Sequence, residues 1–252
     1  MKERMLVLAK ATPTLSKKYQ ELVCIAGITD KGEWRRIYPV RWECFWQRSD
    51  KKFSKKQWIE YETEVDRPSD HRKESRKVRE ITIKPLNEAR FSEIKDLIKN
   101  RITTLEKLQE VGVREESLGV IKPLILDFVE EKSDLHEKAE GMKPQKTLFG
   151  KEAVRLDVPE KQYSYIFYCS DTCRTKHKLL CEDWELTELY RNCKQYRDVG
   201  VYKDDNELFL KIKQRMLEDM LKKNELYFVV GSHYRFPSFM IVGVLYPKKG
   251  DI

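Results

Sequence analysis

The chain has 252 residues, of which 40% are apolar, 11% are aromatic and 37% are charged. This apolar and aromatic content excludes a disordered chain, because Trp, Tyr and Phe supply large buried areas. Basic residues outnumber acidic ones, which gives a net charge of +8. A basic surface favours a polyanionic partner, nucleic acid above all, and the alternative is a solvated basic protein without such a partner.

No apolar run reaches the roughly 18 residues that a membrane-spanning helix requires. The N-terminal stretch MKERMLVLAKATP has too short an apolar run for a signal peptide. We therefore expect a cytoplasmic protein that does not bind membranes. In that compartment the six cysteines should be reduced thiols, buried residues or metal ligands.

The N-terminal half reads as a series of strands. A turn around Gly32 separates two apolar runs, which predicts a hairpin, and Pro39 should end its second strand or place it at a sheet edge. The strands that we expect here cover residues 5–10, 21–28, 34–40, 57–65 and 78–86.

Helices are expected in the middle of the chain. An apolar stripe from Phe91 to Leu108 predicts one kinked helix or two short ones. Thr103 with Glu106 fits a capping box, and Gly112 fits the position after the helix.

The C-terminal half alternates between strands and helix. Strands are expected over 124–131 and 162–169, and two more within 225–247 that form a closing hairpin. Residues 204–224 predict a helix that is capped by Asp205.

Together these elements predict an α+β fold, with a small antiparallel β-barrel or curled sheet and inserted and flanking helices. Residues 1–131 form a β-rich part with a basic loop and a helix pair, and residues 132–162 form a long loop or linker. Residues 163–252 then complete the same domain.

The stretch CSDTCRTKHKLLCEDWE contains four possible zinc ligands, each four residues apart: Cys169, Cys173, His177 and Cys181. On a single helix they would spread over roughly 18 Å, too far to surround one ion. A zinc site therefore requires a turn over 169–173, with His177 and Cys181 one helical turn apart. The spacing is close to that of zinc knuckles, which bind single-stranded nucleic acid, without matching it.

The same stretch has two other interpretations. His177 with Asp183 and Glu185 could form an acid–base site, because a histidine near carboxylates titrates near neutral pH. Alternatively the thiols are buried, and a helix begins at Trp184 with Asp183 as its N-cap.

Residues 66–80, DRPSDHRKESRKVRE, predict a basic loop between two strands. Arginine forks match phosphate oxygens, and aromatic faces stack on bases. The interleaved carboxylates leave a second interpretation, an internally paired charge run. The residues that we expect to contact nucleic acid are Arg36, Arg67, His71, Arg72, Arg76, Lys77 and Trp42.

The turn of the closing hairpin carries His233, Tyr234 and Arg235, which either contact a ligand or form a polar tip. The sequence has no G-x-S-x-G, Walker, Rossmann or H-E-x-x-H motif, so whether it is an enzyme stays open.

Several blocks carry a resemblance: LVLAKATPTLSKKYQELVCIAGI, WRRIYPVRW, PSDHRKESRKV, SLGVIKP and the Cys/His stretch. Over nearly the whole chain they resemble a family of uncharacterised prokaryotic proteins. WRRIYPV and the closing hairpin also look like the small β-barrels of the PUA and ASCH type. That resemblance implies binding of RNA or modified bases at the barrel mouth.

We therefore expect a protein that binds RNA or DNA, with phosphates at the basic loop and bases on aromatic rings. The first alternative is a metal-dependent or His/carboxylate enzyme that acts on nucleic acid or a nucleotide. The second is a structural zinc protein that binds a partner protein. The oligomeric state stays open.

Overall fold

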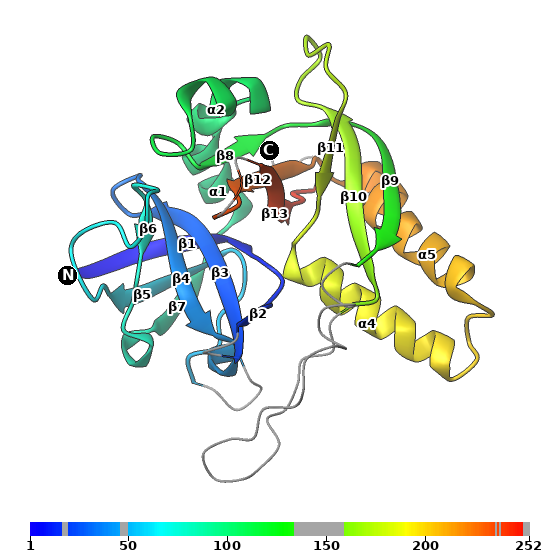
Figure 1. Ribbon diagram of the computed structural model, residues 1–252, viewed down its shortest axis with the longest axis horizontal. Helices are drawn as coiled ribbons and strands as arrows, with labels where there is room; N and C mark the ends of the chain where they lie inside the picture. The colour runs from blue at the N-terminus through cyan, green and yellow to red at the C-terminus, as the bar shows by residue number, and fades with distance from the viewer. Residues whose placement is uncertain (17–19, 46–49, 134–158, 235, 237, 249–252) are drawn as a thin grey trace.

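The computed structural model describes the chain except for residues 17–19, 46–49, 134–158, 235, 237 and 249–252. Strands and helices both contribute to it, which confirms the α+β class (Figure 1). Most of the loop predicted over 132–162 lies outside the described residues. None of the helices in the described parts of the chain combines the length and apolar character needed to span a membrane.

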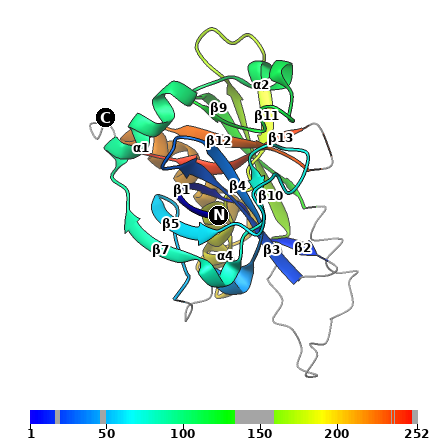
Figure 2. The same ribbon diagram turned by 90° about the vertical axis from the view of Figure 1, so that its left-hand side faces the viewer.

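Among the described residues, the N-terminal part forms a seven-stranded sheet in the order β6-β4-β3-β1-β5-β7, with β2 beside β3. Its end strands β6 and β7 do not pair, so the described sheet stays open rather than closing into a barrel. Figure 2 shows strands β1, β3, β4, β5 and β7 of this sheet from the side. The strands are β1 (Lys2–Lys10), β2 (Thr14–Ser16), β3 (Gln20–Thr29), β4 (Trp34–Arg41), β5 (Gln57–Glu62), β6 (Ser75–Arg76) and β7 (Lys84–Glu88).

Strand β1 is apolar along most of its length because both of its faces are covered. Leu6 and Leu8 pack into one cluster of buried residues, whereas Met5 and Val7 pack into another on the opposite face. All four side chains are fully buried. The strand therefore forms the centre of the N-terminal part, as its sequence predicted.

The β3–β4 hairpin forms as predicted. Gly32 has φ of 78°, a backbone conformation that favours glycine. Strand β4 continues through Pro39, and on its outer side it pairs with β6 only at Arg36 and Ile37. Pro39 therefore lies along the unpaired part of this edge, where the missing N–H is tolerated.

The C-terminal part contains two described three-stranded sheets, β11-β10-β9 and β13-β12-β8. A bridge between Cys181 and Ile241 connects them. The closing hairpin is β12 paired with β13, as predicted. The strands are β8 (Leu118–Ile121), β9 (Leu124–Lys132), β10 (Lys161–Tyr168), β11 (His177–Leu180), β12 (Tyr227–Ser232) and β13 (Phe239–Leu245).

The helices mostly follow the predicted stripes, with shifted caps. The middle of the chain forms two short helices, one of the two predicted outcomes, and Thr104 rather than Thr103 caps the second of them. Asp204 rather than Asp205 caps the later helix, which a π turn interrupts. The helices are α1 (Phe91–Ile98), α2 (Leu105–Val111), α4 (Trp184–Asp198), α5 (Asp205–Lys213) and α6 (Met220–Lys223), and the π turn is η4 (Gln214–Asp219).

The strand predicted over 78–86 is wrong in its first half. Residues Glu80–Thr82 form a short 3-10 helix, η2, and the strand begins only at Lys84. The Thr82 hydroxyl donates a hydrogen bond to the Arg79 carbonyl at 2.7 Å, which closes this turn. Two further 3-10 helices are η1 (Trp42–Phe45) and η3 (Lys99–Arg101).

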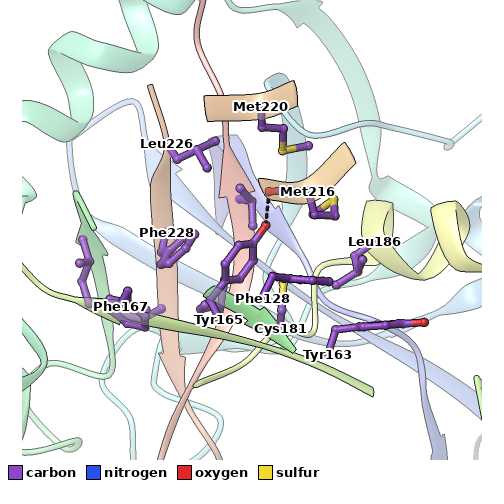
Figure 3. Close-up of a cluster of buried hydrophobic side chains, with 14 of the residues drawn as sticks. Phe128, Tyr163, Tyr165, Phe167, Cys181, Leu186, Met216, Met220, Leu226 and Phe228 are labelled. Atoms are coloured by element: carbon purple, nitrogen blue, oxygen red, sulfur yellow. Dashed lines mark hydrogen bonds between the residues drawn. The ribbon is translucent and has the colours of Figure 1, made fainter. Parts of the chain in front are cut away.

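Aromatic side chains fill the core of the C-terminal part (Figure 3). Tyr165 and Phe167 from β10 pack against Phe228 from β12, with ring centroids 4.8 and 5.2 Å apart. The Tyr165 hydroxyl donates to the Met216 carbonyl in the π turn at 2.9 Å. This bond satisfies a buried polar group and fixes the helical segment over the sheets.

A buried ion pair joins the two parts of the chain. The Lys55 ammonium lies 2.7 Å from an Asp183 carboxylate oxygen and 2.9 Å from Glu185, and it also donates to the Val244 carbonyl. Burial acts to lower the pKa of Lys55, but these carboxylates outweigh it and raise the pKa above its ordinary value. The ammonium group is therefore charged and has three partners.

The substitution Asp183→Asn should lower the free energy of unfolding by about 3 kcal/mol, because it leaves the Lys55 charge buried with half of its compensation. Chemical denaturation measures this effect. Asp96→Asn, which breaks an exposed pair with Lys99, is the control and should change stability by less than about 0.5 kcal/mol. Equal effects of the two substitutions would contradict the role of the buried pair.

Candidate functional site

Four possible metal ligands come together where β10, β11 and α2 meet. Cys169 follows the end of β10, Cys173 lies in the turn, and His177 begins β11. Glu106 reaches the same point from the first turn of α2. Their ligand atoms all lie within 4.8 Å of one another. The structure thus provides a possible metal-binding group of two thiols, one imidazole and one carboxylate.

Local interactions place three of these side chains. The Cys173 N–H donates to the Ser170 carbonyl at 3.1 Å, which forms the turn that the sequence predicted over 169–173. Pairing of β10 with β11 sets Phe167 opposite His177. The turn and the first residue of the returning strand therefore present their side chains on the same side.

The distances within the group suit a tetrahedral ion. The Cys173 sulfur lies 3.7 Å from His177 Nε2 and 3.6 Å from a Glu106 oxygen. Tetrahedral bonds of about 2.0–2.3 Å separate such ligands by roughly 3.4–3.8 Å. His177 Nε2 and Glu106 are 2.8 Å apart, in hydrogen-bond contact, so they would separate slightly around an ion.

Burial shapes the acid–base behaviour of the group. Cys169 is 2% exposed, and burial raises the pKa of its thiol to about 12, although the Leu105 N–H donates to the sulfur. Burial acts to raise the pKa of Glu106, but hydrogen bonds from the α2 backbone and Thr104, together with His177, lower it below its ordinary value. A cation bound at this group would stabilise the thiolate form of Cys169.

Cys181, predicted as the fourth ligand, does not belong to this group. The prediction assumed a helical turn from His177 to Cys181, but these residues lie along extended chain. Four residues of strand cover roughly 13 Å, so the cysteine reaches the aromatic core instead. Its side chain is 7% exposed, and burial raises the pKa of its thiol.

The predicted acid–base set is divided in the same way. Asp183 follows His177 by six positions of mostly extended chain, a path of roughly 20 Å. Asp183 pairs with Lys55, and Glu185 accepts a hydrogen bond from the Tyr246 hydroxyl at 2.8 Å. The predicted cap is confirmed, because Asp183 caps α4 by accepting from the Glu185 N–H. His177, Asp183 and Glu185 thus do not form one centre.

Two predicted phosphate ligands are buried and hold the basic loop in place. Arg72 is 4% exposed, pairs with Asp70 at 2.6 Å and donates to the Ser232 carbonyl. Arg36 is 2% exposed, lies 3.5 Å from Glu74 and donates to Ser117. These arginines face the interior rather than a ligand on the surface, because the interleaved carboxylates pair with them.

The other predicted residues differ in exposure. Arg67, His71 and Lys77 are exposed, whereas Arg76 is partly buried and donates to the carbonyls of Lys73 and Ser75. The side chain of Trp42 and the whole of Arg235 lie outside what the structure describes.

The turn between β12 and β13 lies against the basic loop, a contact that the sequence did not predict. The His71 ring lies 5.5 Å from the Tyr234 ring, centroid to centroid, and the Arg72 guanidinium lies 5.6 Å from that same ring. Tyr234 is 57% exposed and Phe236 is 62% exposed. We call the exposed residues Arg67, His71, Lys73, Lys77, Tyr234 and Phe236 the tip–loop surface.

The fold and these sites define an α+β protein with a possible metal-binding group and an exposed surface of basic and aromatic residues. Residues 1–107 match the family described as Domain of unknown function (DUF8758), and residues 100–251 match Domain of unknown function (DUF8757). The second match covers more than half of the chain, which therefore belongs to the DUF8757 family. No curated protein matches the chain.

Burial raises the pKa of the Glu182 carboxyl to about 7. The folded protein therefore keeps a proton that the unfolded chain loses above its ordinary carboxyl pKa. This difference lowers the free energy of unfolding as the pH rises from about 4.5 to 7. Glu182→Gln should raise Tm relative to the parent protein more at pH 8 than at pH 5. A gain of the same size at both values would contradict this assignment.

Proposed function

We propose that the protein binds nucleic acid through the tip–loop surface. The observation that carries this proposal is the contact of the His71 and Tyr234 rings, exposed beside the basic loop. Exposed cations supply the attraction for phosphates, and exposed rings supply faces for bases.

The charges of the loop support this assignment. Asp70 and Glu74 pair with Arg72 and Arg36 inside the fold, so these carboxylates are compensated. Arg67, Lys73 and Lys77 remain exposed on the same loop, beside the exposed acid Asp66. Lys73 pairs with Glu115 at 3.6 Å, and both side chains are exposed, so the pair is weak.

The proposal extends to the type of fold, the kind of nucleic acid and the cellular compartment. We infer that the open N-terminal sheet is a curled sheet of the PUA and ASCH type, in a prokaryotic family, and that RNA is the ligand such folds imply. We also infer a cytoplasmic protein. No disulfide joins the cysteines in the described residues, which supports a reducing compartment.

Replacing Arg67 and Lys77 together by Ala should weaken binding of a labelled oligonucleotide and reduce the slope of log K against log[salt] by about 1.4–1.8, since two phosphate contacts are lost. Fluorescence anisotropy over a salt series measures both quantities. The matched control replaces Lys203 and Lys211, exposed cations just before and within α5. In Figure 1 this helix lies on the opposite side of the molecule from β6, which belongs to the basic loop. The absence of binding by the parent protein at low salt would refute the proposal.

The second candidate function is that of a structural zinc protein with a protein partner, and the four-ligand group favours it. We infer that zinc is the ion, because thiolate and imidazole ligands with one carboxylate suit this borderline-soft cation. Glu106 belongs to α2, whereas Cys169, Cys173 and His177 belong to the β10–β11 hairpin. An ion would therefore cross-link a helix to a hairpin.

Protein produced with zinc should contain about one zinc per chain, and removal of the zinc by a chelator should lower Tm, because only the folded state has the complete site. Glu106→Gln and Cys173→Ser should each reduce the zinc content. Glu110→Gln, one turn further along α2 and exposed, is the matched control and should keep it. Elemental analysis and thermal melting give the two measurements. Zinc-free parent protein, or equal zinc in all variants, would remove this candidate.

A further inference from the structure

We infer that the ligand is single-stranded nucleic acid, whose unpaired bases stack on Tyr234 and Phe236. This inference rests on the proposed nucleic-acid binding and adds the substrate class. It starts from the position of these two rings, since both belong to the turn between β12 and β13. The two strands themselves are almost wholly buried, whereas the rings beyond them are more than half exposed.

Each exposed ring has an imidazole against it. The centroids of His71 and Tyr234 are 5.5 Å apart at an interplanar angle of 37°. His233 and Phe236 are stacked, with centroids 5.0 Å apart at 24°. A ring supported by a neighbour loses less conformational freedom when a base is added, so these pairs are suited to stacking.

The guanidinium that contacts the Tyr234 ring is buried and held in place by other groups. Arg72, whose guanidinium contacts the Tyr234 ring, is held by Asp70 and by the Ser232 carbonyl. Ser232 ends β12, so this bond ties the basic loop to the start of the hairpin turn. The exposed Tyr234 ring thus packs against the Arg72 guanidinium, which contacts within the fold hold in position.

The exposed cations determine which occupant fits. Exposed aromatics without charge would suit an apolar partner, but here Arg67, Lys73 and Lys77 lie on the loop that supports Tyr234. Phosphates match these cations and bases match the rings, a combination that single strands provide. In a duplex the base faces are stacked on each other, so the Tyr234 and Phe236 rings could not stack on them and the exposed cations would contact phosphates without that gain.

Binding of a labelled single-stranded oligonucleotide, as RNA and as DNA, and of a duplex of the same sequence tests this inference by anisotropy at low salt. The single strand should bind more tightly than the duplex. Tyr234→Ala and Phe236→Ala should each weaken single-strand binding about 5- to 100-fold, with duplex binding unchanged. Tyr234→Phe, which keeps the ring, should retain single-strand binding.

Tyr196→Ala is the matched control, because Tyr196 is 52% exposed and belongs to α4. In Figure 1 this helix lies apart from β6, which belongs to the basic loop. It should leave the binding of every probe unchanged. Equal binding of single strand and duplex, or Tyr234→Ala and Phe236→Ala proteins with full single-strand affinity, would overturn the inference while nucleic-acid binding stands. No binding of any probe by the parent protein would refute the proposed function itself, and with it the inference.

Discussion

The buried pair of Lys55 and Asp183 is the constraint on which the arrangement of this protein depends. An ammonium taken out of water is costly unless all of its partners are in place, so the pair forms only when three segments are correctly positioned. Lys55 belongs to the segment before β5, and Asp183 lies at the start of α4. Val244 of β13 contacts both residues, because its carbonyl accepts from Lys55 and its N–H donates to Asp183. The interaction therefore joins the N-terminal sheet to both the helix that follows the Cys/His stretch and the hairpin that carries Tyr234.

A second polar junction fixes the opposite side of the same interface. The Ser117 hydroxyl donates to the Glu74 carboxylate. The Ser117 carbonyl accepts from the Arg36 guanidinium and from the Ser232 N–H. Arg72 reaches the Ser232 carbonyl from the basic loop. The buried arginines thus anchor the loop to the rest of the fold. Only the exposed cations of the loop can contact a ligand. This division explains how a loop rich in alternating charges can be both anchored to the fold and basic.

Much of the fold could be predicted because its signals are local. The apolar run of β1, the turn at Gly32 and the Asp183 cap of α4 each depend on a few neighbouring residues.

The contacts that define the candidate sites are not local. Glu106 lies 71 positions before His177, and its apparent role in the sequence was that of a capping residue. Cys181 was misplaced because a spacing of four residues suits a helical turn, and only the β-pairing with β10 shows that the chain is extended there. For Arg36 and Arg72, the interleaved carboxylates did indicate internal pairing, but the sequence did not show which arginines they would bury.

The connector that follows α2 relates the two candidate sites. Glu106 stands in the first turn of α2, and Ser117 follows the same helix and meets both the basic loop and β12. Leu105 and Leu108 are buried in the aromatic core, so α2 is packed against the strands beneath it. An ion that bound Glu106 would hold α2 against the β10–β11 hairpin and thereby restrict the segment that ends at Ser117. Because Ser117 contacts Arg36, Glu74 and Ser232, the same restriction would limit the freedom of the loop and hairpin turn whose rings are exposed. The segment from α2 to Ser117 therefore connects the metal-binding group to the tip–loop surface.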